Sequence, residues 1–232
     1  MNFSPYTGNV TTGGPSDVRE LPGLTIRKAS VGPMDNNSYL LTCASTGAQV
    51  LIDAAAEPER LQGLLREGTG GENLELIVTT HRHADHHGAL KSLVESTSAR
   101  TASGADDADG IPVPPSLLLT DDDVISFGDI TLDVVALRGH TPGSIALVYQ
   151  VQDDDATNVP DDQLVHIFTG DSLFPGGVGK THSSQDFQQL LADVTERVFD
   201  RYDNAWVYPG HGKDTTLSAE RPALKEWAQR GW

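Results

Sequence analysis

Residues 81–88 of the chain concentrate side chains that can bind a metal ion, in the order HRHADHHG directly after an apolar run. If the chain stays extended for three residues, His81 and His83 point to the same side, because side chains alternate along a strand. Asp85 and His86 follow as the chain turns, where they can face a second position. Imidazole and carboxylate groups are ligands of divalent cations, so this segment predicts a metal site. The alternative is a polar turn with solvated histidines.

Three later segments have a common pattern, in which an apolar strand is followed by a glycine turn that carries one ligand-type residue. The turns are GHTPGS around His140, TGDS around Asp171 and PGHG around His211. Taken singly, a histidine in such a turn is more often structural than a metal ligand. All three turns in order after the first cluster favour one shared polar site.

The blocks THRHADHHG, GHTPGS, TGDSLF and YPGHG resemble those of metallo-β-lactamase-fold hydrolases, and most of all the glyoxalase II-like (hydroxyacylglutathione hydrolase-like) branch. The resemblance implies an αββα sandwich with two cations at one edge of the sheets. It also implies their ligands, which are His81, His83 and His140 for the first cation, Asp85, His86 and His211 for the second, and Asp171 as the bridge between the two. About twenty residues follow His211, as in short members of the branch, so glutathione specificity stays open.

Three further residues match functional positions of that branch. Asp53, at the end of a strand, resembles an aspartate that steadies the histidine loop; a turn or capping aspartate is the alternative. Lys180 and His182 lie in a glycine-rich loop that resembles the substrate loop, where a basic residue and its neighbour contact the thiol carrier. The alternative there is a flexible loop with a solvated lysine.

The ligand set predicts a hydrolase that uses two divalent cations, with zinc as the first choice and iron or manganese as alternatives. Two such ions share a bridging water and lower its pKa, and we expect Asp85 to aim the resulting hydroxide at a carbonyl. A thioester is the best-matched substrate, because a thiolate leaves without a strong general acid. The rival functions are a persulfide dioxygenase with a single iron and a lactonase or other ester hydrolase on the same site.

The elements that must position these residues read as strands and helices in both halves of the chain. Strand-like runs cover residues 24–29, 38–43, 49–53 and 74–80, and later 123–127, 130–137, 144–150, 164–169 and 205–208. Apolar stripes predict helices after Pro58, around Leu90, after Ser183 and over residues 218–229. This order predicts a layered α/β or α+β fold with one catalytic domain over residues 23–232, preceded by a flexible arm over residues 1–22.

Composition limits the partners. The net charge of −17 makes nucleic acid and anionic membranes poor partners, and no apolar run is long enough to cross a bilayer. We expect a cytoplasmic protein that acts on a small-molecule thioester or ester, and its oligomeric state stays open. Cys43, the one cysteine, is expected to be buried, and the acidic stretches 106–109 and 153–162 to be solvated loops.

Overall fold

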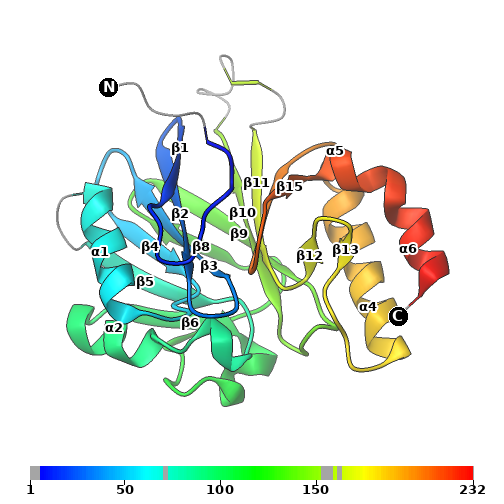
Figure 1. Ribbon diagram of the computed structural model, residues 1–232, viewed down its shortest axis with the longest axis horizontal. Coiled ribbons are helices and arrows are strands. Elements are labelled where there is room, and N and C mark those ends of the chain that lie inside the picture. Colours follow the sequence, from blue (N-terminus) through cyan, green and yellow to red (C-terminus); the bar gives the residue numbers. More distant parts are fainter. Residues whose placement is uncertain (1–5, 70–72, 153–158, 161–163, 232) are drawn as a thin grey trace.

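Two β-sheets lie face to face in the computed structural model of the protein, and each sheet carries helices on its outer side (Figure 1). The structure describes residues 6–69, 73–152, 159–160 and 164–231. The four layers are those of the αββα sandwich that the resemblance implies, and they agree with the layered fold expected from the order of strands and helices. None of the helices in the described ranges is long and apolar enough to span a lipid bilayer.

The first sheet has seven strands and contains the amino-terminal half of the chain. Its strands, in spatial order, are β1 (Asp17–Leu21), β2 (Leu24–Val31), β3 (Asn36–Cys43), β4 (Gln49–Ile52), β5 (Leu74–Thr79), β6 (Arg100–Gly104) and β7 (Leu117–Leu119). Strands β1 to β4 pair antiparallel, whereas β4 to β7 pair parallel. The outer face of this sheet is covered by α1 (Pro58–Thr69) and α2 (Leu90–Thr97).

The second sheet has six strands and contains most of the carboxy-terminal half. Its strands, in spatial order, are β15 (Thr215–Thr216), β14 (Trp206–Pro209), β11 (Val165–Gly170), β10 (Ile145–Gln150), β9 (Ile130–Ala136) and β8 (Val124–Phe127). Helices on its outer side are α4 (Ser184–Val194), α5 (Leu217–Glu220) and α6 (Leu224–Arg230) (Figure 1). A small hairpin of β12 (Leu173–Phe174) and β13 (Gly177–Val178) follows β11.

The alternation of side chains along each strand builds the core in three layers. In β5, Val78 packs between the sheets while Ile77 faces α1 and α2. In β10, Leu147 packs between the sheets while Val148 faces the helices of the other side. Strands buried on both faces explain why the sequence shows continuous apolar runs rather than a polar–apolar alternation.

The topology brings the predicted ligand turns to one edge of the sandwich. Strands β4 and β5 run parallel, and so do β11 and β14. Strand β9 runs in the same direction as β11, because each pairs antiparallel with β10 between them. The turns that follow these five strands carry all the residues that the sequence analysis assigns to the metals, together with Asp53.

The structure differs from the sequence prediction at the terminal helix and at the first acidic stretch. The terminal helix predicted over 218–229 is interrupted by a 3₁₀ turn (Arg221–Ala223), because Pro222 has no N–H to continue the helical hydrogen bonds. The solvated loop predicted over 106–109 is wrong for Asp107, which is fully buried within a 3₁₀ segment (Ala105–Gly110). The other acidic stretch, 153–162, lies mostly outside the described residues.

The first 22 residues, interpreted from the sequence as a flexible arm, contain an ordered element. Residues 17–21 form β1 and pair with β2, while residues 1–5 lie outside the described part of the chain. The mobility of the remainder and the domain boundary at residue 23 stay predictions. Cys43 is buried, as the sequence predicts.

Candidate metal centre

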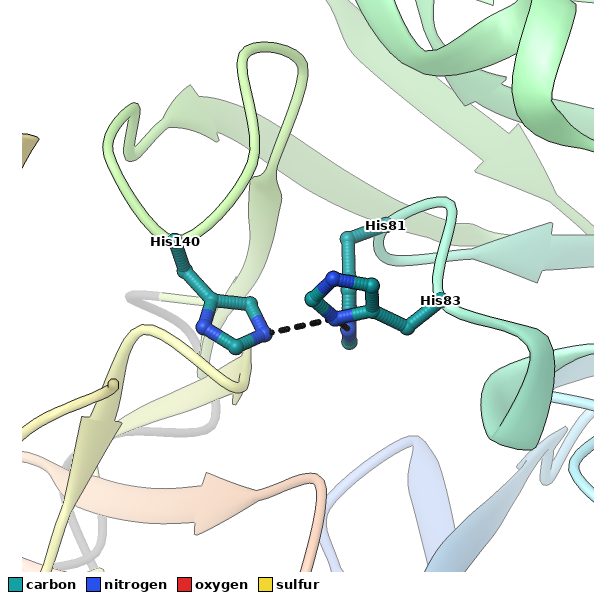
Figure 2. A group of neighbouring side chains, drawn as sticks. All are labelled: His81, His83 and His140. Atoms are coloured by element: carbon teal, nitrogen blue, oxygen red, sulfur yellow. Dashed lines mark hydrogen bonds between the residues drawn. The ribbon is translucent and has the colours of Figure 1, made fainter. Parts of the chain in front are cut away.

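Three histidines from two turns form the first donor group, defined as His81, His83 and His140. Nδ1 of His83 lies 3.0 Å from Nε2 of His81 and 2.9 Å from Nε2 of His140. His81 and His83 come from the turn after β5, and His140 comes from the turn after β9; Figure 2 shows the three rings converging from these loops. One nitrogen of each ring therefore faces the same point.

The second donor group consists of Asp85, His86 and His211. Nε2 of His211 lies 3.2 Å from Nε2 of His86 and 3.3 Å from Oδ2 of Asp85. Asp85 and His86 belong to a 3₁₀ turn (Ala84–His86), and His211 follows β14, so the group joins the two sheets.

Asp171, in the turn after β11, lies between the two groups. Its Oδ2 is 3.6 Å from Nε2 of His140 in the first group and 3.5 Å from Nε2 of His211 in the second. Its Oδ1 is 3.4 Å from Nε2 of His86. The carboxylate can therefore contact a cation on either side.

Hydrogen bonds on the outer side of the rings determine which nitrogens keep a free lone pair. His86 donates its Nδ1–H to Oδ2 of Asp53 at 2.8 Å. His140 donates from Nδ1 to the carbonyl of Lys180 at 2.6 Å, and His211 donates from Nδ1 to the carbonyl of Met34 at 2.9 Å. In its neutral form, each of these rings carries a lone pair on the inward-facing Nε2, which is the tautomer that binds a metal.

The outer side of His81 is fixed through a hydroxyl. Thr80 donates its Oγ1–H to Oδ2 of Asp53 at 2.8 Å. Because that proton is used, Oγ1 of Thr80 accepts the Nδ1–H of His81 at 3.1 Å. The backbone N–H of Thr80 donates to Oδ1 of the same aspartate, also at 2.8 Å. Asp53 therefore sets the tautomers of one histidine in each donor group.

The spacing of the inward-facing atoms suits a divalent cation. Ligands about 2.0–2.1 Å from a tetrahedral zinc ion are separated from one another by roughly 3.3 Å. The distances given above fall on both sides of that value, and the donor atoms within each triplet lie within 4.8 Å of one another. In addition, the buried Oδ1 of Asp171 has no hydrogen-bond donor among the described residues. Converging lone pairs and an unsatisfied carboxylate oxygen are unfavourable unless a cation balances them.

Without a cation, burial and charge act differently on the two donor groups. Burial lowers the pKa of His81 well below its usual value, and the neighbouring His86 adds to the effect, so its ring is neutral. Burial also disfavours the charged form of His86, but the carboxylates of Asp53 and Asp171 outweigh it and raise the pKa of His86 to about 10. For Asp171, burial raises the pKa, yet contacts with His211 and His86 hold it far below the usual range.

Asp85 is the most accessible member of the second donor group, with 27% of its side chain exposed against 21% for His211 and 0% for His86. Asn36, buried at the start of β3, donates from Nδ2 to Oδ2 of Asp85 at 2.9 Å. Burial raises the pKa of Asp85, but this hydrogen bond and the nearby His86 outweigh it, and the pKa is lowered. The carboxylate is therefore ionised, oriented and open to a small molecule.

The glycine of the PGHG turn is required by close packing. A Cβ on Gly210 would lie 2.6 Å from Cε1 of His86 and would overlap Oδ1 of Asp171. Only a residue without a side chain lets the turn pass this close to the donors.

Comparison with known proteins agrees with this geometry. The family model of the metallo-beta-lactamase superfamily matches residues 31–157, which is more than half of the chain. The chain belongs to the metallo-β-lactamase superfamily.

Three proteins similar to the chain differ in how much of their own length the match covers. A probable hydroxyacylglutathione hydrolase of Schizosaccharomyces pombe is 28% identical over 78% of the chain, and the match covers 65% of that relative's length. A probable metallo-hydrolase of Bacillus subtilis, YqgX, is 27% identical over 84% of the chain and 93% of its own length. The solved structure of TTHA1623 in a di-iron-bound form has a TM-score of 0.64 and 29% identity, and it covers 84% of the chain and 96% of its own.

The structure of this superfamily member gathers the seven predicted ligands into one cluster, and Asp53 contacts it directly. Of the two residues predicted to contact substrate, His182 is exposed and lines a cavity beside His83 and His140. The side chain of Lys180 is exposed as well, and this residue contacts the cluster through its backbone carbonyl, which accepts from Nδ1 of His140.

Several supporting groups were not assigned a role from the sequence. They are Asn36, Thr80 and the carbonyl groups of Met34 and Lys180. Asn36 lies just before the strand predicted over residues 38–43, where the sequence analysis assigns no functional residue. Backbone carbonyls leave no signal in the sequence, because every residue has one.

Proposed function

We propose that the protein is a hydrolase that binds two divalent cations and cleaves thioesters of small thiol carriers. The observation that carries this proposal is the convergence of seven nitrogen and oxygen donors in two groups that share Asp171. Zn²⁺ suits these donors, and iron or manganese are alternatives. The similarity to TTHA1623 in its di-iron-bound form supports two cations per chain.

Bound cations would generate a nucleophile from water near neutral pH and polarise the carbonyl of the substrate. The protein contributes a dry, ordered surrounding for this chemistry. His81, His86 and Asp53 are almost fully buried, so they do not move to accommodate substrate. Asp85, oriented by Asn36, is the residue that we propose to accept the proton of the attacking water.

A cavity of about 440 Å³ beside the first donor group can receive the substrate. His83 and His140 form part of its wall, and His182, Arg82 and Arg138 form another part. A substrate whose carbonyl lies between the donor groups would extend along these side chains. We propose that His182 contacts the thiol carrier there and that the exposed ammonium group of Lys180 binds an anionic part of it.

The chemistry of the leaving group favours a thioester over an amide. A thiol has a pKa near 8.5, so its thiolate can leave without receiving a proton in the same step. An amide nitrogen needs a proton donor at the leaving atom. The similarity to a probable hydroxyacylglutathione hydrolase supports the same choice.

The test is a substrate panel on protein whose metal content has been measured. S-lactoylglutathione, other S-acyl thiols and a lactone should be compared after loading with Zn²⁺, Fe²⁺ or Mn²⁺. We expect thioester hydrolysis that needs close to two cations per chain. Turnover of the lactone without turnover of any thioester would replace this proposal by a lactonase.

The same metal-analysed protein also distinguishes the proposed hydrolase from the rival function, a persulfide dioxygenase. A persulfide dioxygenase with one iron would consume oxygen with a thiol persulfide and would reach full activity at one iron per chain. Seven donors in two groups favour the hydrolase.

A further inference from the structure

A buried ion pair lies behind the loop that carries His211. Lys28 in β2 is fully buried, and its ammonium group lies 2.6 Å from Oδ1 of Asp214. The same group donates to the carbonyl of Gly212 at 2.7 Å and to the carbonyl of Gly8 at 2.8 Å. All three N–H donors of the ammonium are used, and they join the first sheet, the His211 loop and the amino-terminal segment.

The segment over residues 6–12 is anchored to this ion pair. The hydroxyl of Tyr6 donates to Oδ2 of Asp214, the carboxylate oxygen that Lys28 leaves free. The Tyr6 ring packs edge-on against Trp206. The guanidinium group of Arg19 lies 4.3 Å from the centre of the Tyr6 ring. Asp214 thus receives a strong donor from each side.

The same segment also holds the second loop that touches His211. Thr12 donates from Oγ1 to Oδ1 of Asp35 at 2.6 Å. Asp35 has a left-handed backbone (φ 55°) and follows Met34, whose carbonyl accepts the Nδ1–H of His211. Residues 6–12 therefore contact both loops that fix the position of this histidine.

We infer that residues 6–12, together with Lys28 and Asp214, position His211 and thereby set the affinity for the cation of the second donor group. The supporting contacts of the first donor group run through Thr80 and Lys180, so that group is held by other parts of the chain. The inference rests on the proposed function only in requiring that both donor groups bind cations. Tyr6 and Thr12 are positioning residues, because they act through the loops and do not touch the cluster.

The test is a Zn²⁺ titration of the full chain against a chromophoric chelator, which resolves a first and a second binding step. In the double variant Tyr6→Phe/Thr12→Val, we expect the second step to weaken about 10-fold and the first to stay unchanged, since partners that orient a ligand contribute about this much to metal affinity. The matched control is Tyr149→Phe/Thr120→Val. It deletes a hydrogen bond to the carbonyl of Pro22 and one to Asp123, both far from the His211 loop in the chain.

A stronger perturbation removes the ion pair itself. Lys28→Met alone leaves a buried carboxylate uncompensated and risks unfolding, whereas Lys28→Met/Asp214→Asn removes both charges. We expect this neutral pair to keep the fold by circular dichroism and to lose more second-step affinity than the Tyr6 and Thr12 variant.

The outcomes separate the two claims. Wild-type protein that binds fewer than two cations would overturn the proposed function and this inference with it. Wild-type protein that binds two, with unchanged steps or equally weakened steps in the double variants, would overturn the inference alone. Melting temperatures reveal a purely structural role, which lowers stability without changing the ratio of the two binding constants.

Discussion

Replacing Asp53 by asparagine tests the proposal that one buried carboxylate sets the tautomers on both sides of the centre. Asp53 is 1% exposed and accepts three hydrogen bonds at 2.8 Å, from the N–H and Oγ1–H of Thr80 and from Nδ1–H of His86. Asparagine keeps the shape but has one acceptor oxygen and one NH₂ donor. If the oxygen serves the N–H of Thr80, the NH₂ group faces Nδ1 of His86.

Two donors cannot bond to each other, so His86 would have to move its proton to Nε2. That proton occupies the lone pair that faces Asp85 and His211. Losing one hydrogen bond to a buried charged group costs roughly 1.5–3 kcal/mol. At about 1.4 kcal/mol per factor of ten, this corresponds to a loss of roughly 10- to 100-fold in affinity for the second cation. The first cation should weaken less, because His81 depends on Asp53 only through Thr80.

The assay is the two-step Zn²⁺ titration, with Asp193→Asn as the matched control. Asp193 is also a buried aspartate, with 4% of its side chain exposed, but it binds Arg138 and Arg197 rather than a donor of the metal centre. We expect the control to lose thermal stability and to keep both binding constants. An Asp53→Asn protein that binds both cations as tightly as the wild type would refute the role assigned to this carboxylate.

Four further outcomes follow from the same geometry. As pH falls, the second cation should leave before the first, because protons compete more strongly for its histidines. Burial and neighbouring histidines lower the pKa values of the first donor group, whereas carboxylates raise the pKa values of His86 and His211 despite burial. Metal analysis after dialysis across a pH series checks this order. Asp85→Asn should lower kcat by about 10²- to 10⁴-fold with the fold intact, and equal turnover would remove its role as proton acceptor. Gly210→Ala should displace His86, so the variant should hold about one cation per chain. Asp107→Asn should cost roughly 3 kcal/mol and lower Tm by about 6–12 °C in a melting curve, since this buried carboxylate binds three groups.

The sequence predicts the strands and helices well where burial is strong. The apolar runs that predict β5 and β10 are confirmed because each strand is buried on both faces, apart from Glu75 in β5 and Gln150 in β10. It does not predict β6 and β7, whose residues 100–104 and 117–119 are small, polar or few. Those strands exist because the parallel edge of the first sheet offers hydrogen bonds to them, which is tertiary information.

The sequence predicts donors better than the groups that orient them. Ligand residues stand out because histidine is rare in this chain, with 8 in 232 residues, whereas an orienting group can be any carbonyl or hydroxyl. Asp107 illustrates the difference, since it stands in an acidic run that suggests solvent. In the fold, its carboxylate accepts the N–H of Arg82 and the N–H of Gly143, so it ties the turn of the first two histidines to the turn of His140.

Hydrogen bonds of this kind, from backbone donors to buried carboxylates, explain how an acidic chain can keep a defined cation site. The protein carries a net charge of −17, yet the buried carboxylates Asp53 and Asp107 have their oxygens occupied by donors from the chain itself. They organise the turns without competing for a cation. Asp171, by contrast, keeps a buried oxygen without a donor among the described residues, and Asp85 keeps an exposed face. Within the donor groups, Asp171 and Asp85 therefore leave negative charge open toward the centre, which favours cation binding at the point where the histidine lone pairs converge.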